Sequence, residues 1–253
     1  IFCGMGAADM AQSAEQIVVT GGWPLNGTVR VPAAKNSVLP LLAAALLCQR
    51  PVRLRGVPRL SDVECSLALL RGAGCTAQWQ GSDVALSGSP VQSTLPGQTA
   101  AQMRASILFC APLLARLGRA ETVLPGGCRI GSRPIDLHLK GFRALGATVI
   151  EEDGMVKAYA EKLIGTSIYM DQVSVGATIN VMLAATMAEG TTTIENAAKE
   201  PHVVDTANYL NMMGANIKGA GTDVIRIKGV SELKGAQYTI IPDQIEAGTY
   251  MIA

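Results

Sequence analysis

The segment GATINVMLAATMA, residues 176–188, decides the fold because it opens one of three copies of a repeating pattern. Its continuous apolar character predicts a buried helix. After it, the sequence predicts a strand at residues 191–195, an amphipathic helix at 203–213 that Gly214 ends, and a hairpin turning at 221–223. A helix, a strand, a second helix and a hairpin therefore make up one unit.

Two earlier units show the same order of elements at a regular spacing. The hairpin aspartates lie 70 residues apart, at Asp83, Asp153 and Asp223. The openings of the first helices lie 72 residues apart, at Arg104, Gly176 and Gly248, so position 248 is expected to begin a fourth, unfinished unit. Repeats of this length indicate stacked α/β units that share a core.

The same pattern sets the limits of the other elements. In the first unit we expect helices at residues 38–48 and 62–72, a strand at 52–55 and hairpin strands at 76–80 and 84–87. In the second unit we expect helices at 104–117 and 136–145, a strand at 122–124 and a hairpin turn at 153–154. Short strands are expected before the first unit, at residues 17–19 and 28–31.

The composition argues against nucleic-acid and membrane partners. The chain has 253 residues, a net charge of +1 and 4% aromatic residues, whereas a nucleic-acid surface needs a basic stripe or a stacking platform. The longest mostly apolar runs, residues 38–48 and 105–115, are far shorter than the roughly 20 residues that span a bilayer. We therefore expect neither partner.

The cysteines and histidines favour reduced thiols without a metal. The six cysteines contain no CxxC pair, which is more typical of reduced thiols in a cytosol than of a disulfide framework. The chain has two histidines, and no His or Cys pair has the spacing of metal ligands. We therefore expect no zinc site.

A glycine-rich loop, LPGGCRIGSRP at residues 124–134, interrupts the second unit. Its three glycines and two prolines exclude a regular helix or strand, so its backbone can approach a ligand closely. Cys128 lies between Arg129 and Arg133, whose charges favour the thiolate and suit a phosphate or carboxylate. The residue types alone leave two interpretations open: a nucleophile or acid beside an anionic substrate, and a solvated loop with an inert thiol.

Equivalent loops of successive units are expected to point the same way. Lys35, Arg104, the loop at residues 126–133 and residues 174–176 could therefore line one surface near helix N-termini. Helix N-termini attract anions through their backbone N–H groups and the helix dipole. The spacing thus predicts a cleft for a phosphorylated ligand.

Five motifs resemble the UDP-N-acetylglucosamine enolpyruvyl transferase family, in that family's order and spacing, from about residue 17 to residue 253. They are Ala34-Lys35-Asn36, Met103-Arg104-Ala105-Ser106, and residues 124–136, 174–178 and 241–249. The resemblance implies an inside-out α/β barrel fold made of repeated β-α-β-α-β-β units. It divides the chain into an irregular extension (1–16), strands of an incomplete first domain (17–32), a complete three-unit barrel with the cysteine loop (33–241), and a return into the incomplete domain (242–253).

The resemblance also implies a reaction, in which the enolpyruvyl group of phosphoenolpyruvate is transferred to the 3′-hydroxyl of UDP-N-acetylglucosamine with release of phosphate. This is the first committed step of peptidoglycan synthesis in the bacterial cytoplasm, and it needs no metal or other cofactor. By the same resemblance Cys128 is the general acid and the thiol that fosfomycin alkylates, while Lys35, Arg104 and Arg133 hold phosphate and carboxylate. The residues implied to bind the UDP-sugar are Asn36, Pro134, Ile135, Asp136, Leu137, Ser174, Val175 and Gly176, together with Arg133.

This chain lacks some residues of the family, and two other functions are considered beside the one that the resemblance implies. The family's aspartate base and further arginines have no counterpart in this chain, so we expect the chain to catalyse little turnover by itself. Gln172 and Gln244 receive no role, because the family commonly has basic residues at these two positions. An enolpyruvyl transferase for shikimate 3-phosphate has the same chemistry but lacks the Pro-Gly-Gly-Cys loop. A non-catalytic UDP-sugar-binding homologue is disfavoured by Lys35, Arg104, Cys128 and Arg133. The oligomeric state is not predicted.

Overall fold

The structure, a computed structural model, describes residues 18, 20–22, 24, 26–126 and 134–253. Cys128 and Arg133, to which the resemblance gives catalytic roles, lie outside these described residues. Ile17 and Val19 of the first predicted strand do so as well.

The three predicted units are present. The first contains α1 (Lys35–Ala44), the short 3-10 helix η1 (Ala45–Leu47), β1 (Val52–Arg55), α2 (Ser61–Gly72), β2 (Thr76–Gln80) and β3 (Asp83–Ser87). The second contains α3 (Gly97–Ala100), the 3-10 helix η2 (Arg104–Phe109), α4 (Cys110–Leu117), β4 (Arg119–Val123), α5 (Asp136–Ala144), β5 (Thr148–Glu152) and β6 (Met155–Tyr159). The third contains β7 (Ser167–Tyr169), α6 (Val175–Ala185), β8 (Thr191–Glu195), α7 (Pro201–Met212), β9 (Asn216–Lys218) and β10 (Val224–Lys228), and β11 (Gln237–Thr239) and α8 (Gln244–Ile252) follow.

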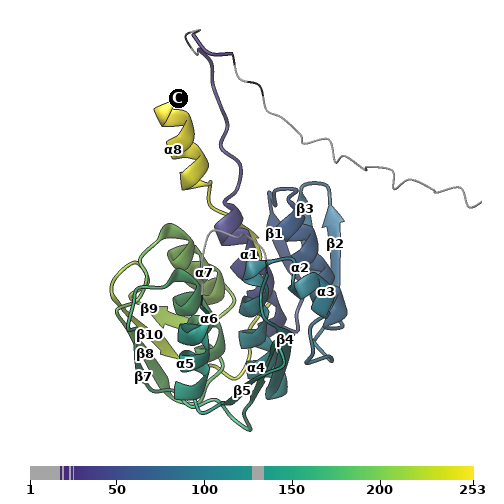
Figure 1. Ribbon diagram of the computed structural model, residues 1–253, viewed down its shortest axis with the longest axis vertical. Helices are drawn as coiled ribbons and strands as arrows, with labels where there is room; N and C mark the ends of the chain where they lie inside the picture. Colours follow the sequence, from purple (N-terminus) through teal and green to yellow (C-terminus); the bar gives the residue numbers. More distant parts are fainter. Residues whose placement is uncertain (1–17, 19, 23, 25, 127–133) are drawn as a thin grey trace, which may run out of the picture.

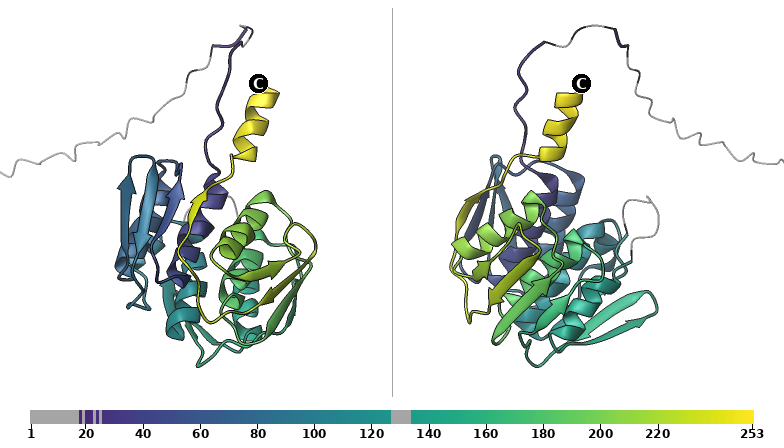
Figure 2. Two further views of the ribbon diagram at one scale, coloured as in Figure 1. Left: turned by 180° about the vertical axis from the view of Figure 1, so that it is seen from behind. Right: turned by 90° about the vertical axis from the view of Figure 1, so that its left-hand side faces the viewer.

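Three sheets of equivalent topology lie on the outside of the molecule, with helices packed between them (Figures 1 and 2). The strand orders are β11-β1-β3-β2, β4-β6-β5 and β7-β8-β10-β9. Within each sheet, the strand between the two helices pairs antiparallel with the second hairpin strand, as β1 does with β3. This arrangement confirms the predicted inside-out α/β fold.

The unit that the resemblance implies begins with a strand, but the sequence pattern did not locate these parallel edge strands. β7 pairs with β8, and β11, which follows the third unit, pairs with β1 of the first, so that Arg53 lies opposite Gln237. In the second sheet this strand is reduced to a single bridge between Thr94 and Glu121. Segments of three residues or fewer carry too little alternation to be recognised, yet β11 closes the ring of units.

Helix burial agrees with the apolar patterns. Every residue of α6 from Ala177 to Ala185 is buried, as expected for a central helix. In α2 the predicted face of Val63, Leu67 and Leu70 is buried, and Gly74, at φ +100°, follows the helix end.

Three sequence predictions are wrong in detail. Residues 28–31 form no strand, because no strand among the described residues lies beside them to supply ladder partners. Arg104 opens a 3-10 helix, and the α-helix begins only at Cys110; Pro112 has no N–H to donate to the carbonyl of Leu108. The last helix begins at Gln244, four residues before Gly248, because the Asp243 side chain accepts hydrogen bonds from the backbone N–H groups of Ile245 and Glu246.

Candidate active site

A cavity of about 1050 Å³ lies where the N-terminal ends of α1, η2, α5 and α6 meet. The predicted common surface near helix N-termini is thereby confirmed for Lys35, Arg104 and residues 174–176, whereas Gly126, the one described residue of the loop at 126–133, does not line the cavity. Of the predicted site residues, those that line the cavity are Lys35, Asn36, Arg104, Pro134, Asp136, Leu137, Ser174, Val175 and Gly176. Ile135 is buried and does not line it.

The N-terminus of α1 is held from a distant part of the chain. Ala34 precedes the helix and has no side chain that could cap it. The Lys35 backbone N–H donates instead to Oδ2 of Asp243, at 3.2 Å, and Lys35 Nζ lies 2.6 Å from a carboxylate oxygen of Asp62. Asn36 is the second residue of α1, so it is not the N-cap that its residue type suggests.

A buried carboxylate also holds the first turn of α1. Asp205 of α7 is 1% exposed; its Oδ2 accepts a hydrogen bond from Ser37 Oγ, and its Oδ1 accepts one from the Tyr238 hydroxyl at 2.6 Å. Burial and this carboxylate raise the pKa of Tyr238. The sequence analysis missed Asp205, although a charged residue between the apolar positions Val203 and Ala207 was a usable signal.

Arg104 links the second unit to the entrance of α5. Its Nη2 donates to the backbone carbonyl of Pro134 at 3.0 Å. A charged side chain at the start of an apolar helix needs such a polar partner. Asp136 is the first residue of α5 rather than its N-cap, which is Ile135.

The N-terminus of α6 carries its own cap. Ser174 Oγ accepts a hydrogen bond from the Ala177 backbone N–H at 3.3 Å. The first N–H groups of any α-helix have no intrahelical acceptor, so those of the residues after Ser174 can serve a ligand. Gly176 packs on His138: a Cβ at residue 176 would lie 3.0 Å from its Cε1 and 3.1 Å from its Nε2.

His138 also lines the cavity, and the sequence analysis gave it no role, having counted it only as one of two histidines without metal-ligand spacing. It is buried on α5, and its Nδ1 lies 2.9 Å from Nδ2 of the buried Asn180. Burial, and secondly the positive charge of Arg104, lower the pKa of His138 to about 4. The imidazole is therefore neutral at physiological pH.

The remaining wall comes from α7 and α8. Glu200, His202, Gln244 and Ile245 line it. Burial lowers the pKa of His202, while the negative charges of Glu200, Asp243 and Asp205 oppose that shift. Gln172, the other residue left without a role, also lines the cavity.

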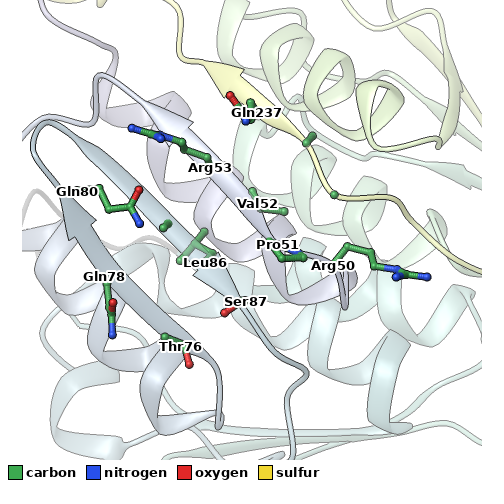
Figure 3. A pocket seen from close by; sticks show the side chains of 13 residues that line it. Arg50, Pro51, Val52, Arg53, Thr76, Gln78, Gln80, Leu86, Ser87 and Gln237 are labelled. Carbon is green, nitrogen blue, oxygen red and sulfur yellow. The ribbon is translucent and has the colours of Figure 1, made fainter.

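A second hollow of about 510 Å³ lies on the sheet of β1, β2, β3 and β11, and contains none of the predicted site residues (Figure 3). Arg50, Arg53, Gln78 and Gln80 are among the side chains around it. The Arg53 guanidinium is paired with Asp83 at 2.8 Å. The described residues that were predicted for the site therefore line the larger cavity and not this hollow.

Metal ligands and membrane-spanning helices were sought among the described residues. They contain no group of three or more His, Cys, Asp and Glu side chains placed to hold a metal ion. None of their helices has the length and apolar character that crossing a membrane requires.

Comparison with known proteins gives a consistent set of relatives. The sequence profile of the family described as EPSP synthase (3-phosphoshikimate 1-carboxyvinyltransferase) matches residues 19–253. Over 94% of its length the chain is 52% identical to UDP-N-acetylglucosamine 1-carboxyvinyltransferase 1 of Caldanaerobacter subterraneus subsp. tengcongensis, and 53% identical to UDP-N-acetylglucosamine 1-carboxyvinyltransferase of Clostridium botulinum. It covers 57% and 58% of these two proteins, so it spans little more than half the length of the curated relatives it matches.

Solved structures agree on the fold. The enolpyruvyl transferase NikO from Streptomyces tendae superposes with a TM-score of 0.80 at 27% identity, covering 91% of this chain and 55% of that one. EPSP synthase from Acinetobacter baumannii superposes with a TM-score of 0.71 at 20% identity, covering 89% of this chain and 52% of that one. The three-unit barrel is thus a shared architecture.

Proposed function

The chain belongs to the EPSP synthase family, and from this premise we propose that it is the N-terminal portion of a UDP-N-acetylglucosamine 1-carboxyvinyltransferase. The observation that carries the proposal is the single cavity that collects Lys35, Asn36, Arg104, Asp136 and residues 174–176 from three units. Two cationic side chains and a capped helix N-terminus suit a ligand with phosphate and carboxylate groups.

In the proposed reaction the sugar 3′-hydroxyl oxygen forms a bond to C2 of phosphoenolpyruvate while a proton is added to C3. The hydroxyl proton goes to a base, and loss of phosphate together with a C3 proton from the tetrahedral intermediate restores the double bond and leaves the enolpyruvyl ether. Lys35 and Arg104 offset the negative charge of phosphate and carboxylate, an electrostatic contribution that is often the largest in catalysis. Residues 134–137, which include Asp136, bind the nucleotide end of the UDP-sugar. The N-terminus of α6 binds its phosphate oxygens.

Cys128 as the acid at C3 and Arg133 as an anion-binding residue remain predictions from the resemblance, because both lie outside the described residues. Alkylation by fosfomycin, mapped by mass spectrometry over the six cysteines, tests the first of them. Modification of Cys128 alone is the expected result.

The cellular role follows from the same proposal. The product would feed peptidoglycan synthesis in the bacterial cytoplasm. Since the chain spans little more than half of its relatives, we expect the isolated chain to bind the sugar nucleotide weakly and to release little phosphate from phosphoenolpyruvate.

Calorimetric titration of the chain with UDP-N-acetylglucosamine and with shikimate 3-phosphate tests the substrate class. Binding of the sugar nucleotide alone is expected, and Asp136→Asn, which changes a residue assigned to the nucleotide end, should weaken it. Glu151→Gln is the matched control, because Glu151 of β5 pairs with Arg143 of α5 and does not line the cavity. Preference for shikimate 3-phosphate would overturn the proposal.

A further inference from the structure

The contact with Ile107 alone, without any assumption about His138, determines which way the Asn180 amide points. Its Nδ2 lies 3.2 Å from the backbone carbonyl oxygen of Ile107, which can only accept a hydrogen bond. Turning the amide over would place two acceptor oxygens against each other at a fully buried position. The atom that faces Ile107 is therefore the NH₂ nitrogen.

The same nitrogen determines the tautomer of His138. Asn180 Nδ2 lies 2.9 Å from His138 Nδ1, and because Nδ2 is a donor, Nδ1 must accept. A neutral imidazole carries one proton, so this proton is on Nε2. Protonating Nδ1 as well would set an N–H against the NH₂ group of Asn180, so the contact itself opposes the imidazolium.

The remaining nitrogen, Nε2–H, faces the start of α6. It would lie 3.1 Å from a Cβ at residue 176, and both His138 and Gly176 line the cavity. His138 is 6% exposed, and none of the hydrogen bonds found among the described residues involves its Nε2. Because Nε2 is not one of the buried polar atoms that lack a partner, this donor reaches the cavity, where a ligand can supply the acceptor.

We propose that His138 is a binding residue of this cavity, a neutral imidazole whose Nε2–H donates a hydrogen bond to a phosphate oxygen of the ligand at the α6 N-terminus. The inference rests on the proposed function and names one more group that recognises its sugar nucleotide. A neutral donor suits this position because Arg104 already supplies positive charge nearby. Asn180 is the positioning residue, since it sets the tautomer through Nδ1.

The tautomer is measured first, on the 253-residue chain labelled with ¹⁵N. Two-bond ¹H–¹⁵N spectra of imidazole rings distinguish the Nε2–H, Nδ1–H and doubly protonated forms, and the chain has two histidines, so His202→Gln assigns both sets of signals. We expect the Nε2–H form of His138, unchanged from pH 8 to pH 5.5. An Nδ1–H form, or protonation near pH 6.5, would overturn the inference.

The ligand contact is measured with UDP-N-acetylglucosamine as the probe. A glutamine amide at position 138 can place its NH₂ near the Nε2 position, whereas asparagine places it near the Nδ1 position. We therefore expect His138→Gln to bind within about threefold of the wild type and His138→Asn to bind about tenfold more weakly, as for loss of one hydrogen bond to a charged oxygen. The Nε2–H signal of the wild type should also shift on binding.

The outcomes separate the two proposals. Equal affinities of the wild type, His138→Gln and His138→Asn would overturn the inference and leave the proposed function standing. Absence of any sugar-nucleotide binding by the wild type would overturn both the proposed function and the ligand contact. If a variant does not fold, the shift of the wild-type Nε2–H signal on binding decides: a shift supports the contact, and its absence despite binding overturns it.

Discussion

Two helix N-termini that line the cavity, those of α1 and α6, are held in different ways. At α6 the cap is local: Ser174 immediately precedes the helix and its Oγ binds the Ala177 N–H. At α1 the contacts are remote. The Lys35 backbone N–H donates to Asp243, which lies 208 residues later, and the Ser37 hydroxyl donates to Asp205, which lies 168 residues later.

The difference shows that the two sides of the cavity form under different conditions. The α6 side needs only contacts within the second and third units. The α1 side, which carries Lys35 and Asn36, needs the chain to have returned through β11 and Asp243 to the first unit. We infer that the position of Lys35 depends on the C-terminal part of the chain, and four experiments test this comparison.

Removing the buried carboxylate should have the largest effect. Asp205→Ala leaves the Ser37 and Tyr238 hydroxyls without their acceptor, so the free energy of unfolding is expected to fall by about 2–5 kcal/mol. Chemical denaturation measures this change. Asp171→Asn, which removes an exposed ion pair with Lys140, is the control and should cost less than about 0.5 kcal/mol. Equal stabilities of the two variants would refute the remote support of α1.

At the α6 side of the cavity, the contribution of His138 to the free energy of unfolding should decrease in acid. Its pKa in the folded state, about 4, lies below its ordinary value of 6.5, so the unfolded chain binds a proton that the folded chain does not. The stability from the neutral ring is therefore complete above about pH 6.5 and is lost as the pH falls toward 4, up to about 3 kcal/mol. Denaturation midpoints measured from pH 7.5 to pH 4.5 should fall less steeply for His138→Gln than for the wild type. Parallel slopes would contradict this assignment.

Asp243 holds the starts of α1 and α8, and its loss should affect the amides there rather than the stability of the whole chain. Its Oδ1 accepts from Ile245 and Glu246 N–H, and its Oδ2 accepts from Lys35 N–H. In Asp243→Ala, hydrogen exchange of these three amides is expected to be about tenfold faster, as for the loss of one hydrogen bond per amide. Faster exchange at Ile245 and Glu246 without a change at Lys35 would mean that Asp243 does not hold α1.

The smallest effect is expected from the local cap. Ser174→Ala removes one acceptor for the Ala177 N–H at the start of α6, and should cost about 0.5–1 kcal/mol of unfolding free energy. Ser174→Asp, which retains a capping acceptor, is the matched control and should recover most of this loss. The exchange rate of the Lys35 amide should not change in either variant, and a change there would show that the two helix starts are coupled.

The sequence by itself determined the features that repeat or depend on neighbouring residues. The 70-residue spacing of Asp83, Asp153 and Asp223 gave three units, because each unit presents the same apolar and turn pattern. Lys35, Arg104 and residues 174–176 were placed on one surface because equivalent loops of stacked units point the same way. The family resemblance added Asn36, Asp136 and the residues around them.

Only the tertiary structure decided the contacts between residues far apart in the chain. Asp205 and Asp243 act on α1 across more than 160 positions, and β11 completes the first sheet with three residues. No local pattern records such pairings, because burial and hydrogen-bond partners are set by where the chain returns. His138 makes the same point: its sequence context is that of any helix residue, and only the packing of Asn180, Ile107 and Gly176 around it fixes its proton and its direction.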